Sequence, residues 1–325
     1  MRNGLIYSIL FLVVGSPEIG QAQTVVPLKN ITQYQVYFGR LNEDPNSQIL
    51  VIRKFVANDK VFFLTINSET LKTQVIPSSG TTVQAEKAEE FRQLIETTPY
   101  GMVLRKSNKA YSSLQDAGLT DTMPGQHGID LTVDLCPSQK PLTRELFTAI
   151  INAFTPEERP VPVSISITGI WMLEHPDDLN WLLNLVSTGQ LNITWINHTL
   201  HHRYNPSLPL DENFLLEKNT DIDTEVLGNE QMMLEHGLIP SIFFRFPGLV
   251  SDAAIFENVS NYGLIVLGSD AWLAKGQIPR QGSIVLVHGN GNEPIGIQDF
   301  LKLLSTNNQL IKERKWLLLD INGIH

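Results

Sequence analysis

Hydrophobic and polar positions follow different patterns on the two sides of a segment near residue 120. Between residues 31 and 71, short apolar runs alternate with polar, turn-forming stretches, which is typical of strands joined by tight turns. Residues 85–98 then repeat apolar positions about every 3.6 residues, which predicts an amphipathic helix. Together these segments predict a small α+β accessory domain at residues 28–111.

The second pattern begins after residues 112–128, which have neither period and which we interpret as a linker. Beyond it, strand-like apolar runs are mostly followed by helix-length amphipathic segments. The runs are residues 129–135, 161–168, 191–197, 240–246, 263–268, 283–288 and 315–320. Alternating β and α units imply a parallel sheet covered by helices, either doubly wound or closed into a barrel. We expect this α/β domain to span residues 129–325.

Composition and charge limit the classes of partner. The chain has 325 residues, of which 42% are hydrophobic and 18% charged, so it is long enough and apolar enough to form a substantial core. Its 34 acidic and 24 basic residues give a formal charge of −10, which repels a phosphate backbone. We therefore expect no nucleic-acid partner, and neutral or cationic substrates fit better.

The first 22 residues have the features of a secretory signal peptide. Arg2 precedes an apolar run at residues 5–14, and small residues follow near position 22. The alternative is a short uncleaved anchor, but the run is much shorter than the roughly 20 residues that span a bilayer. Cys136 is the only cysteine, so no internal disulfide can form. We expect a periplasmic or secreted protein without a stable membrane span after cleavage.

Titratable and guanidinium side chains lie at the carboxyl ends of the predicted strands. In chain order these residues are Asp134, His198, Arg245, Asp270 and His288. The carboxyl ends of parallel strands meet at one rim, where α/β proteins place their chemistry. The strand starts have no comparable set of residues. The sequence therefore predicts a single site at this rim.

Two histidines four positions apart suggest a metal site. His198 and His202 would lie on one side of a helical turn, where two imidazoles can hold a divalent metal. The alternative is a solvated, histidine-rich loop with structural hydrogen bonds. His201 lies between them and should point elsewhere.

The remaining strand-end residues each have a functional and a structural interpretation. Asp134 is flanked by apolar residues, so it needs a cation, a metal or a water nearby, and Arg245 is a suitable partner. A helix cap or a structural ion pair is the other interpretation of Asp134. His288 precedes two glycines that would let a ligand approach closely, although it could also be a core histidine.

The order of these residues resembles the polysaccharide deacetylase family, also called the NodB-homology domain or carbohydrate esterase family four. The resemblance covers about residues 129–311. The family's five motifs correspond, in order, to Thr132–Leu135, His198–His202, Arg245–Gly248, Asp270–Trp272 and Leu286–His288. Each motif is weak alone, but five in order, each at a strand end, are a specific signal.

The resemblance implies a distorted (β/α) barrel, preceded here by the α+β domain. It also implies removal of N-acetyl or other acyl groups from a glycan, with water activated by a divalent metal, of which zinc is the first expectation. His198 and His202 would be metal ligands, and Asp134 would be the base. Amide hydrolysis needs such a base, a Lewis acid for the oxyanion and a proton for the leaving nitrogen.

The same resemblance implies roles for four more residues. His288 would be the acid that protonates the leaving amine, and Asp270 would tune it. Arg245 would orient Asp134. Trp272 would form a wall of the sugar groove.

One departure from the family affects the metal. The second carboxylate of the first motif is the family's third ligand, and this chain has Leu135 there. Asp134 could itself become the third ligand, in which case another group must act as base. Cys136 could reach in, because residues two apart on a strand share a face, although a lone cysteine is more often simply packed. In the third alternative the metal is lost, and a degenerate, non-catalytic domain binds polysaccharide without cleaving it.

Overall fold

The computed structural model describes residues 26–41, 48–112, 114–122 and 127–325. The predicted signal peptide at residues 1–22 lies outside these ranges. In the described ranges, no helix combines the length and the apolar character that crossing a bilayer requires.

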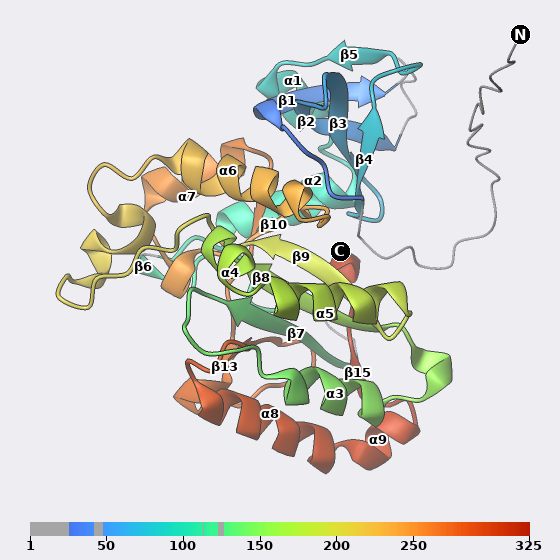
Figure 1. The fold of residues 1–325 in the computed structure, drawn as a ribbon, viewed down its shortest axis with the longest axis vertical. Helices are drawn as coiled ribbons and strands as arrows, with labels where there is room; N and C mark the ends of the chain where they lie inside the picture. The colour runs from blue at the N-terminus through green and yellow to red at the C-terminus, as the bar shows by residue number, and fades with distance from the viewer. Residues whose placement is uncertain (1–25, 42–47, 113, 123–126) are drawn as a thin grey trace, which may run out of the picture.

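The N-terminal unit is an antiparallel sheet with two helices (Figure 1). Its strand order is β4-β3-β2-β1-β5. The elements are β1 (Thr32–Leu41), β2 (Ile49–Ala57), β3 (Lys60–Asn67), β4 (Thr73–Pro77), β5 (Val83–Ala85), α1 (Ala88–Leu94) and α2 (Pro99–Lys109). Asn58 and Asp59 join β2 to β3 with φ values of 48° and 60°, a left-handed conformation that these two residue types tolerate well. The predicted α+β character of this region is confirmed.

The second unit is a curled parallel sheet with helices on its outer side (Figure 1). Its strand order is β12-β10-β9-β8-β7-β14-β13, and β15 also pairs with β7. The strands are β7 (Gly128–Leu135), β8 (Val161–Ile167), β9 (Leu191–Asn197), β10 (Phe243–Phe244), β12 (Ile265–Val266), β13 (Ala271–Trp272), β14 (Ile284–His288) and β15 (Leu317–Leu318). The helices are α3 (Arg144–Ala153), α4 (Gly169–Glu174), α5 (Pro176–Ser187), α6 (Ile222–Glu235), α7 (Ala253–Asn261), α8 (Pro294–Thr306) and α9 (Asn308–Lys312).

This arrangement is a distorted (β/α) barrel, as predicted. All eight residues of β7, which pairs with β8 on one side and β14 on the other, are buried, including the polar residues Asp130, Thr132 and Asp134. The predicted strand at 240–246 is reduced to Phe243–Phe244. Pro240 has no amide hydrogen for the ladder, and Pro247 begins a 3₁₀ turn, so regular pairing has little room there.

The segment that the sequence analysis interpreted as a linker contacts the barrel in its described parts. Within it, β6 (Leu114–Gln115) pairs with β11 (Val250–Ser251). Leu119 forms a parallel bridge with Leu267 of the barrel. The chain between the two units is therefore held against the barrel by backbone hydrogen bonds.

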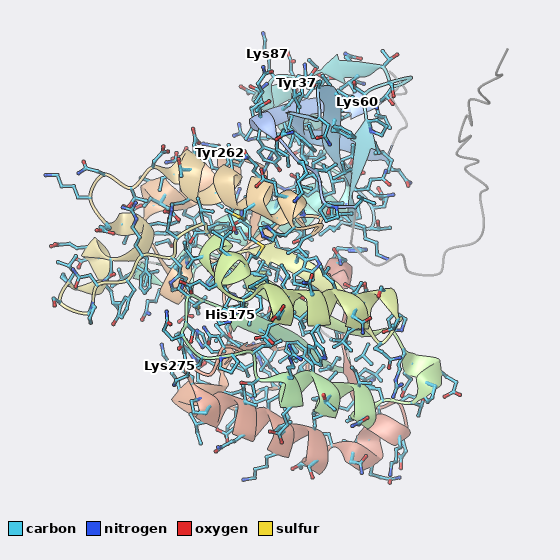
Figure 2. The ribbon with its side chains drawn as sticks, in the orientation of Figure 1. Tyr37, Lys60, Lys87, His175, Tyr262 and Lys275 are labelled. Carbon is cyan, nitrogen blue, oxygen red and sulfur yellow. The ribbon has the colours of Figure 1, made fainter. Side chains whose placement is uncertain are left out.

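A buried ion pair joins the N-terminal unit to the barrel. Arg53 of β2 contacts Glu230 of α6 at 2.7 Å, and both side chains are almost completely buried. Tyr34 also donates a hydrogen bond to Glu230, at 2.8 Å. Arg53 also donates to the carbonyl oxygen of Tyr262, at the junction of the units (Figure 2). Because unpaired buried charges are costly, this network favours one orientation of the two units.

Asp130 of β7 is a buried carboxyl group at the start of the strand. Its side-chain oxygens have no hydrogen-bond partner among the described residues. Burial, together with nearby Asp320, raises the pKa of Asp130 to about 8. Between pH 3.8 and about 8 the folded protein therefore keeps a proton that the unfolded chain releases, so this group lowers stability as the pH rises.

We predict that Asp130→Asn removes this pH dependence. The advantage of the variant in free energy of unfolding should grow from pH 4 to pH 8, by at most about 1.4 kcal/mol per pH unit. Urea denaturation across this range measures the change. The exposed control Asp211→Asn should run parallel to the wild-type protein. A difference between Asp130→Asn and wild type that stays constant with pH would contradict the prediction.

Candidate functional site

The carboxyl ends of β7, β9 and β14 meet at one end of the barrel, above a cleft. His288 of β14 lies in register with Asp134 of β7. The cleft has a volume of about 700 Å³. Its lining includes Cys136, His202, Tyr204, Trp272, His288 and Glu293.

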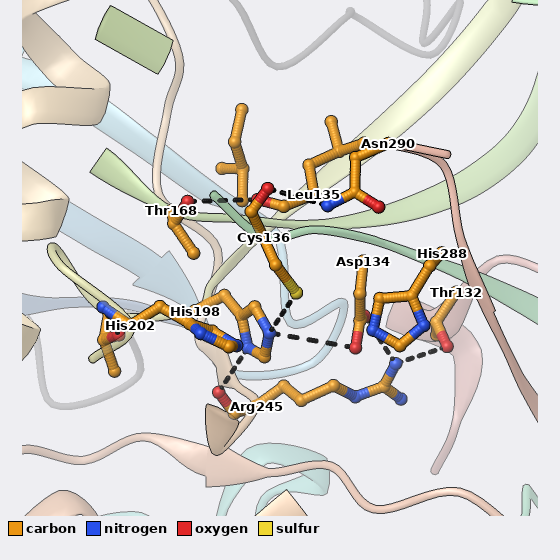
Figure 3. Close-up of polar contacts among 12 residues, drawn as sticks. Thr132, Asp134, Leu135, Cys136, Thr168, His198, His202, Arg245, His288 and Asn290 are labelled. Atoms are coloured by element: carbon orange, nitrogen blue, oxygen red, sulfur yellow. Dashed lines mark hydrogen bonds and ion pairs between the residues drawn. The ribbon is translucent and has the colours of Figure 1, made fainter. Parts of the chain in front are cut away.

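Arg245 holds Asp134 at the base of this site (Figure 3). The guanidinium is completely buried and donates to a carboxylate oxygen of Asp134 at 3.0 Å. It also donates to the hydroxyl of Thr132 and to the carbonyl oxygen of Gly268. One side chain thus connects β7 with the segment after β12.

The surroundings of Asp134 favour its ionised form. Burial alone would raise its pKa, but Arg245, His198 and His288 outweigh burial and hold the pKa below its usual value. The second carboxylate oxygen lies 3.8 Å from Nε2 of His198. Asp134 is therefore a carboxylate with one oxygen engaged by Arg245 and the other directed toward the histidine.

His198 and His202 lie close together, but through a loop and not through the helical turn that their spacing predicted. The loop follows β9 and contains two left-handed residues, Thr199 at φ 70° and His202 at φ 49°. The two imidazole centroids are 4.9 Å apart. Asn197 accepts a hydrogen bond from the Thr199 amide, which stabilises this tight turn.

His201 points away from the cluster, as predicted. Its Nδ1 lies 2.8 Å from a carboxylate oxygen of Glu225, and its backbone amide donates to the other oxygen. Glu225 therefore anchors the loop to α6.

His198 is oriented by the backbone of the arginine motif. Its Nδ1 lies 2.9 Å from the carbonyl oxygen of Arg245. Because a carbonyl only accepts hydrogen bonds, Nδ1 donates, and in the neutral imidazole Nε2 is the nitrogen that presents a lone pair. That Nε2 lies 3.6 Å from the sulfur of Cys136.

Leu135 and Cys136 face opposite ways at the end of β7. The side chain of Leu135 is buried in the apolar core with Val133 and Leu142. Cys136, on the same face as Asp134, points to the histidines (Figure 3). Burial would raise the pKa of the Cys136 thiol, but His202 and His288 hold it well below the usual value.

These side chains fit a divalent metal. Single donor atoms of Cys136, His198 and His202 all lie within 4.8 Å of one another, and Asp134 is outside this group. Nε2 of His202 is buried and has no hydrogen-bond partner among the residues described. An unpaired buried nitrogen is costly, and a metal would satisfy it.

His288 is paired with a residue that the sequence analysis missed. Its Nδ1 lies 2.7 Å from Oε2 of Glu293, which also accepts from the indole N–H of Trp272 at 2.7 Å. Burial lowers the pKa of His288, but Cys136, Glu293 and Asp134 raise it well above its usual value. The only feature of the sequence that could have indicated Glu293 is its position five residues after His288, in a loop without a regular period.

Asp270 has other contacts than the expected one with His288. Its Oδ2 accepts from Arg280 and Ser283, each at 3.2 Å. Nδ1 of His288 contacts Glu293 instead, because the loop after β14 folds back toward Trp272. The side chain that contacts His288 Nδ1 is therefore Glu293, and the contacts of Asp270 are with Arg280 and Ser283.

Comparisons with known proteins give two kinds of match. A family model described as the RP012 protein N-terminal domain matches residues 32–101. Solved structures similar to this chain belong to carbohydrate esterase family 4, the family that the five motifs resemble.

Three of these structures illustrate the range. A family 4 carbohydrate esterase from Bacillus anthracis is 17% identical, with 69% of this chain and 90% of that chain covered and a TM-score of 0.46. PdaA, a family 4 carbohydrate esterase from Bacillus subtilis, is 15% identical, with 80% and 92% covered and a TM-score of 0.46. A family 4 pseudoenzyme from Bacillus anthracis is 16% identical, with 65% and 69% covered and a TM-score of 0.44.

The buried pair of Asp134 and Arg245 predicts strong coupling between the two residues. Arg245→Met should lower the free energy of unfolding by about 3–5 kcal/mol, because it leaves a buried carboxylate unpaired. Adding Asp134→Asn should recover part of this loss. Urea denaturation of both single variants and the double variant measures the coupling. If the loss in the double variant equals the sum of the losses in the two single variants, the prediction is wrong.

Proposed function

We propose that this protein is an exported hydrolase that removes acyl groups, N-acetyl groups first, from a polysaccharide with the help of a divalent metal. One observation supports this function above the others. Asp134, which is held by Arg245, and His288, which is held by Glu293, lie in register on the adjacent strands β7 and β14. Beside them lies a cluster of side chains that can ligate a metal. Amide hydrolysis uses this combination of groups. Export rests on the signal-peptide pattern at residues 1–22.

The metal would be held by His198 and His202, with zinc as the first candidate because imidazole suits it. When bound, it would polarise the acyl oxygen and stabilise negative charge there. The predictions for Asp134 included both third ligand and base. Its engagement by Arg245 supports the role of base.

Asp134 would accept the proton of the attacking water. Its low pKa keeps it ionised, and Arg245 restricts its rotation, so a free oxygen remains directed toward the histidines. Thr132 and Gly268 hold the guanidinium, which keeps the base in place.

His288 would donate a proton to the leaving amine. Glu293 accepts the Nδ1 hydrogen, so Nε2 is the nitrogen that would donate to the substrate. The raised pKa of His288 favours the protonated form that an acid needs.

Aromatic side chains at the cleft support a sugar as substrate. Trp272 lies beside His288 with ring centroids 5.8 Å apart, and Lys275 lies 3.6 Å over the indole. Tyr204 stacks on Phe214 with centroids 5.2 Å apart and is largely exposed. Flat rings beside polar groups provide both apolar contact and hydrogen bonds, which a pyranose ring uses.

A non-catalytic, glycan-binding domain is the second candidate. Leu135, at the family's carboxylate position, lies in the core and offers no ligand. The wild-type protein distinguishes the two candidates. Acetate release from N-acetylglucosamine oligomers that chelator abolishes supports the hydrolase, whereas binding of the oligomers without release supports the second candidate.

We predict that Asp134→Asn and His288→Gln each lower kcat by about 10²- to 10⁴-fold with little change in KM, because each removes proton transfer. Acetate release from N-acetylglucosamine oligomers measures this loss. His127→Gln is the control, since the side chain of His127 is exposed and lies outside the cleft lining, and it should retain activity. Full kcat in either of the first two variants would refute the assigned role.

The two contacts of Glu293 can be separated by a second pair of variants. Glu293→Gln should lower kcat by about 10- to 100-fold, because it weakens the orientation of His288. Trp272→Phe keeps a ring but removes the indole N–H, so it should mainly raise KM. Steady-state kinetics on the same oligomers separates the effects, and an increase in KM with unchanged kcat for Glu293→Gln would show that Glu293 positions only the tryptophan.

A further inference from the structure

We propose that Cys136 is the third protein ligand of the metal, with His198 and His202, and that the chain thereby has a His₂Cys site where its family uses a carboxylate. The proposal deepens the metal site of the proposed function, but it concerns binding and does not depend on turnover. Its basis is the position of one sulfur and two imidazoles at the end of β7.

The distances suit tetrahedral coordination. Zinc–sulfur and zinc–nitrogen bonds of about 2.3 and 2.0–2.1 Å place a sulfur and a nitrogen about 3.5 Å apart in a tetrahedral site. Sγ of Cys136 and Nε2 of His198 are 3.6 Å apart. Ligand atoms of all three residues lie within 4.8 Å of one another, so a small inward movement would bring them to a common ion.

Each of the two histidines has a ring nitrogen on the side of the cluster. Nδ1 of His198 donates to the carbonyl oxygen of Arg245, so Nε2, which lies 3.6 Å from the sulfur, is the nitrogen that can bind a metal once it is unprotonated. Such a backbone contact is the usual support of a metal-binding histidine. Nε2 of His202 is buried without a hydrogen-bond partner among the described residues.

The backbone around Cys136 is held in place. Asn290, completely buried after β14, donates to the carbonyl oxygen of Cys136 at 2.7 Å. Thr168, after β8, donates through its hydroxyl to the carbonyl oxygen of Leu135 at 3.1 Å. Leu135 is thereby kept in the core and Cys136 on the site face, so the third ligand position shifts by one residue along the chain.

This donor set predicts the class of metal. One thiolate and two imidazoles favour Zn²⁺ and Co²⁺ over Mg²⁺, Ca²⁺ or Mn²⁺, which prefer oxygen ligands. It also leaves Asp134 free of the metal, since Arg245 engages that carboxylate.

The test is titration of the purified, metal-free protein with Co²⁺. We expect about one equivalent to bind and to give the intense near-ultraviolet band of a thiolate–cobalt bond. Cys136→Ser should abolish the band and weaken binding at least about tenfold. Asp134→Asn should keep both, and so should His127→Gln, which changes an exposed histidine outside the cleft lining.

Several outcomes overturn the proposal. These are Co²⁺ bound without the thiolate band, wild-type affinity in Cys136→Ser, loss of binding in Asp134→Asn, and no binding at all. Because the band belongs to the wild-type protein, poor folding of a variant does not prevent the test. Activity that survives chelator but is lost in Cys136→Ser would also overturn it, since Cys136 would then act without a metal.

The proposed hydrolase function can fail independently of the proposed metal ligand. A thiolate–cobalt band in a protein that releases no acetate from N-acetylglucosamine oligomers would uphold the ligand and refute catalysis.

Discussion

The buried guanidinium of Arg245 is the constraint on which the rest of the site depends. A charge without solvent must be compensated by close partners, and Arg245 has three, on Asp134, Thr132 and Gly268. Its own carbonyl oxygen accepts from His198. One residue therefore positions both the carboxylate and the first histidine, so the two proposed chemical roles share a single support.

A second buried ion pair lies at the junction of the barrel and the N-terminal unit. Arg53 and Glu230 form a buried pair between the N-terminal sheet and α6, with Tyr34 on the same carboxylate. Helix α6 also contains Glu225, which anchors the histidine loop through His201. The N-terminal unit and the site loop thus both contact α6, and the apolar core is continuous across the junction of the units.

At the end of β7 the sequence departs from the pattern of the polysaccharide deacetylases that it resembles, and the geometry there has a simple cause. Side chains alternate along β7, so Asp134 and Cys136 face the cleft while Val133 and Leu135 face the core. Leucine at position 135 gains apolar burial, and a sulfur lies beside the histidines one residue later. The carboxylate that the motif would have at position 135 is therefore missing, but the sulfur of Cys136 lies beside the histidines.

The sequence by itself determined the strand–helix alternation and the five charged strand ends, because periodicity and chain order are local properties. It also predicted the pairing of Asp134 with Arg245 and the outward direction of His201. Tertiary structure alone decided that Glu293 and not Asp270 contacts His288, that the two histidines meet through a left-handed loop, and that residues near 112–128 pair with the barrel. These features depend on how irregular loops fold back on distant strands, and no period in the sequence encodes such distances.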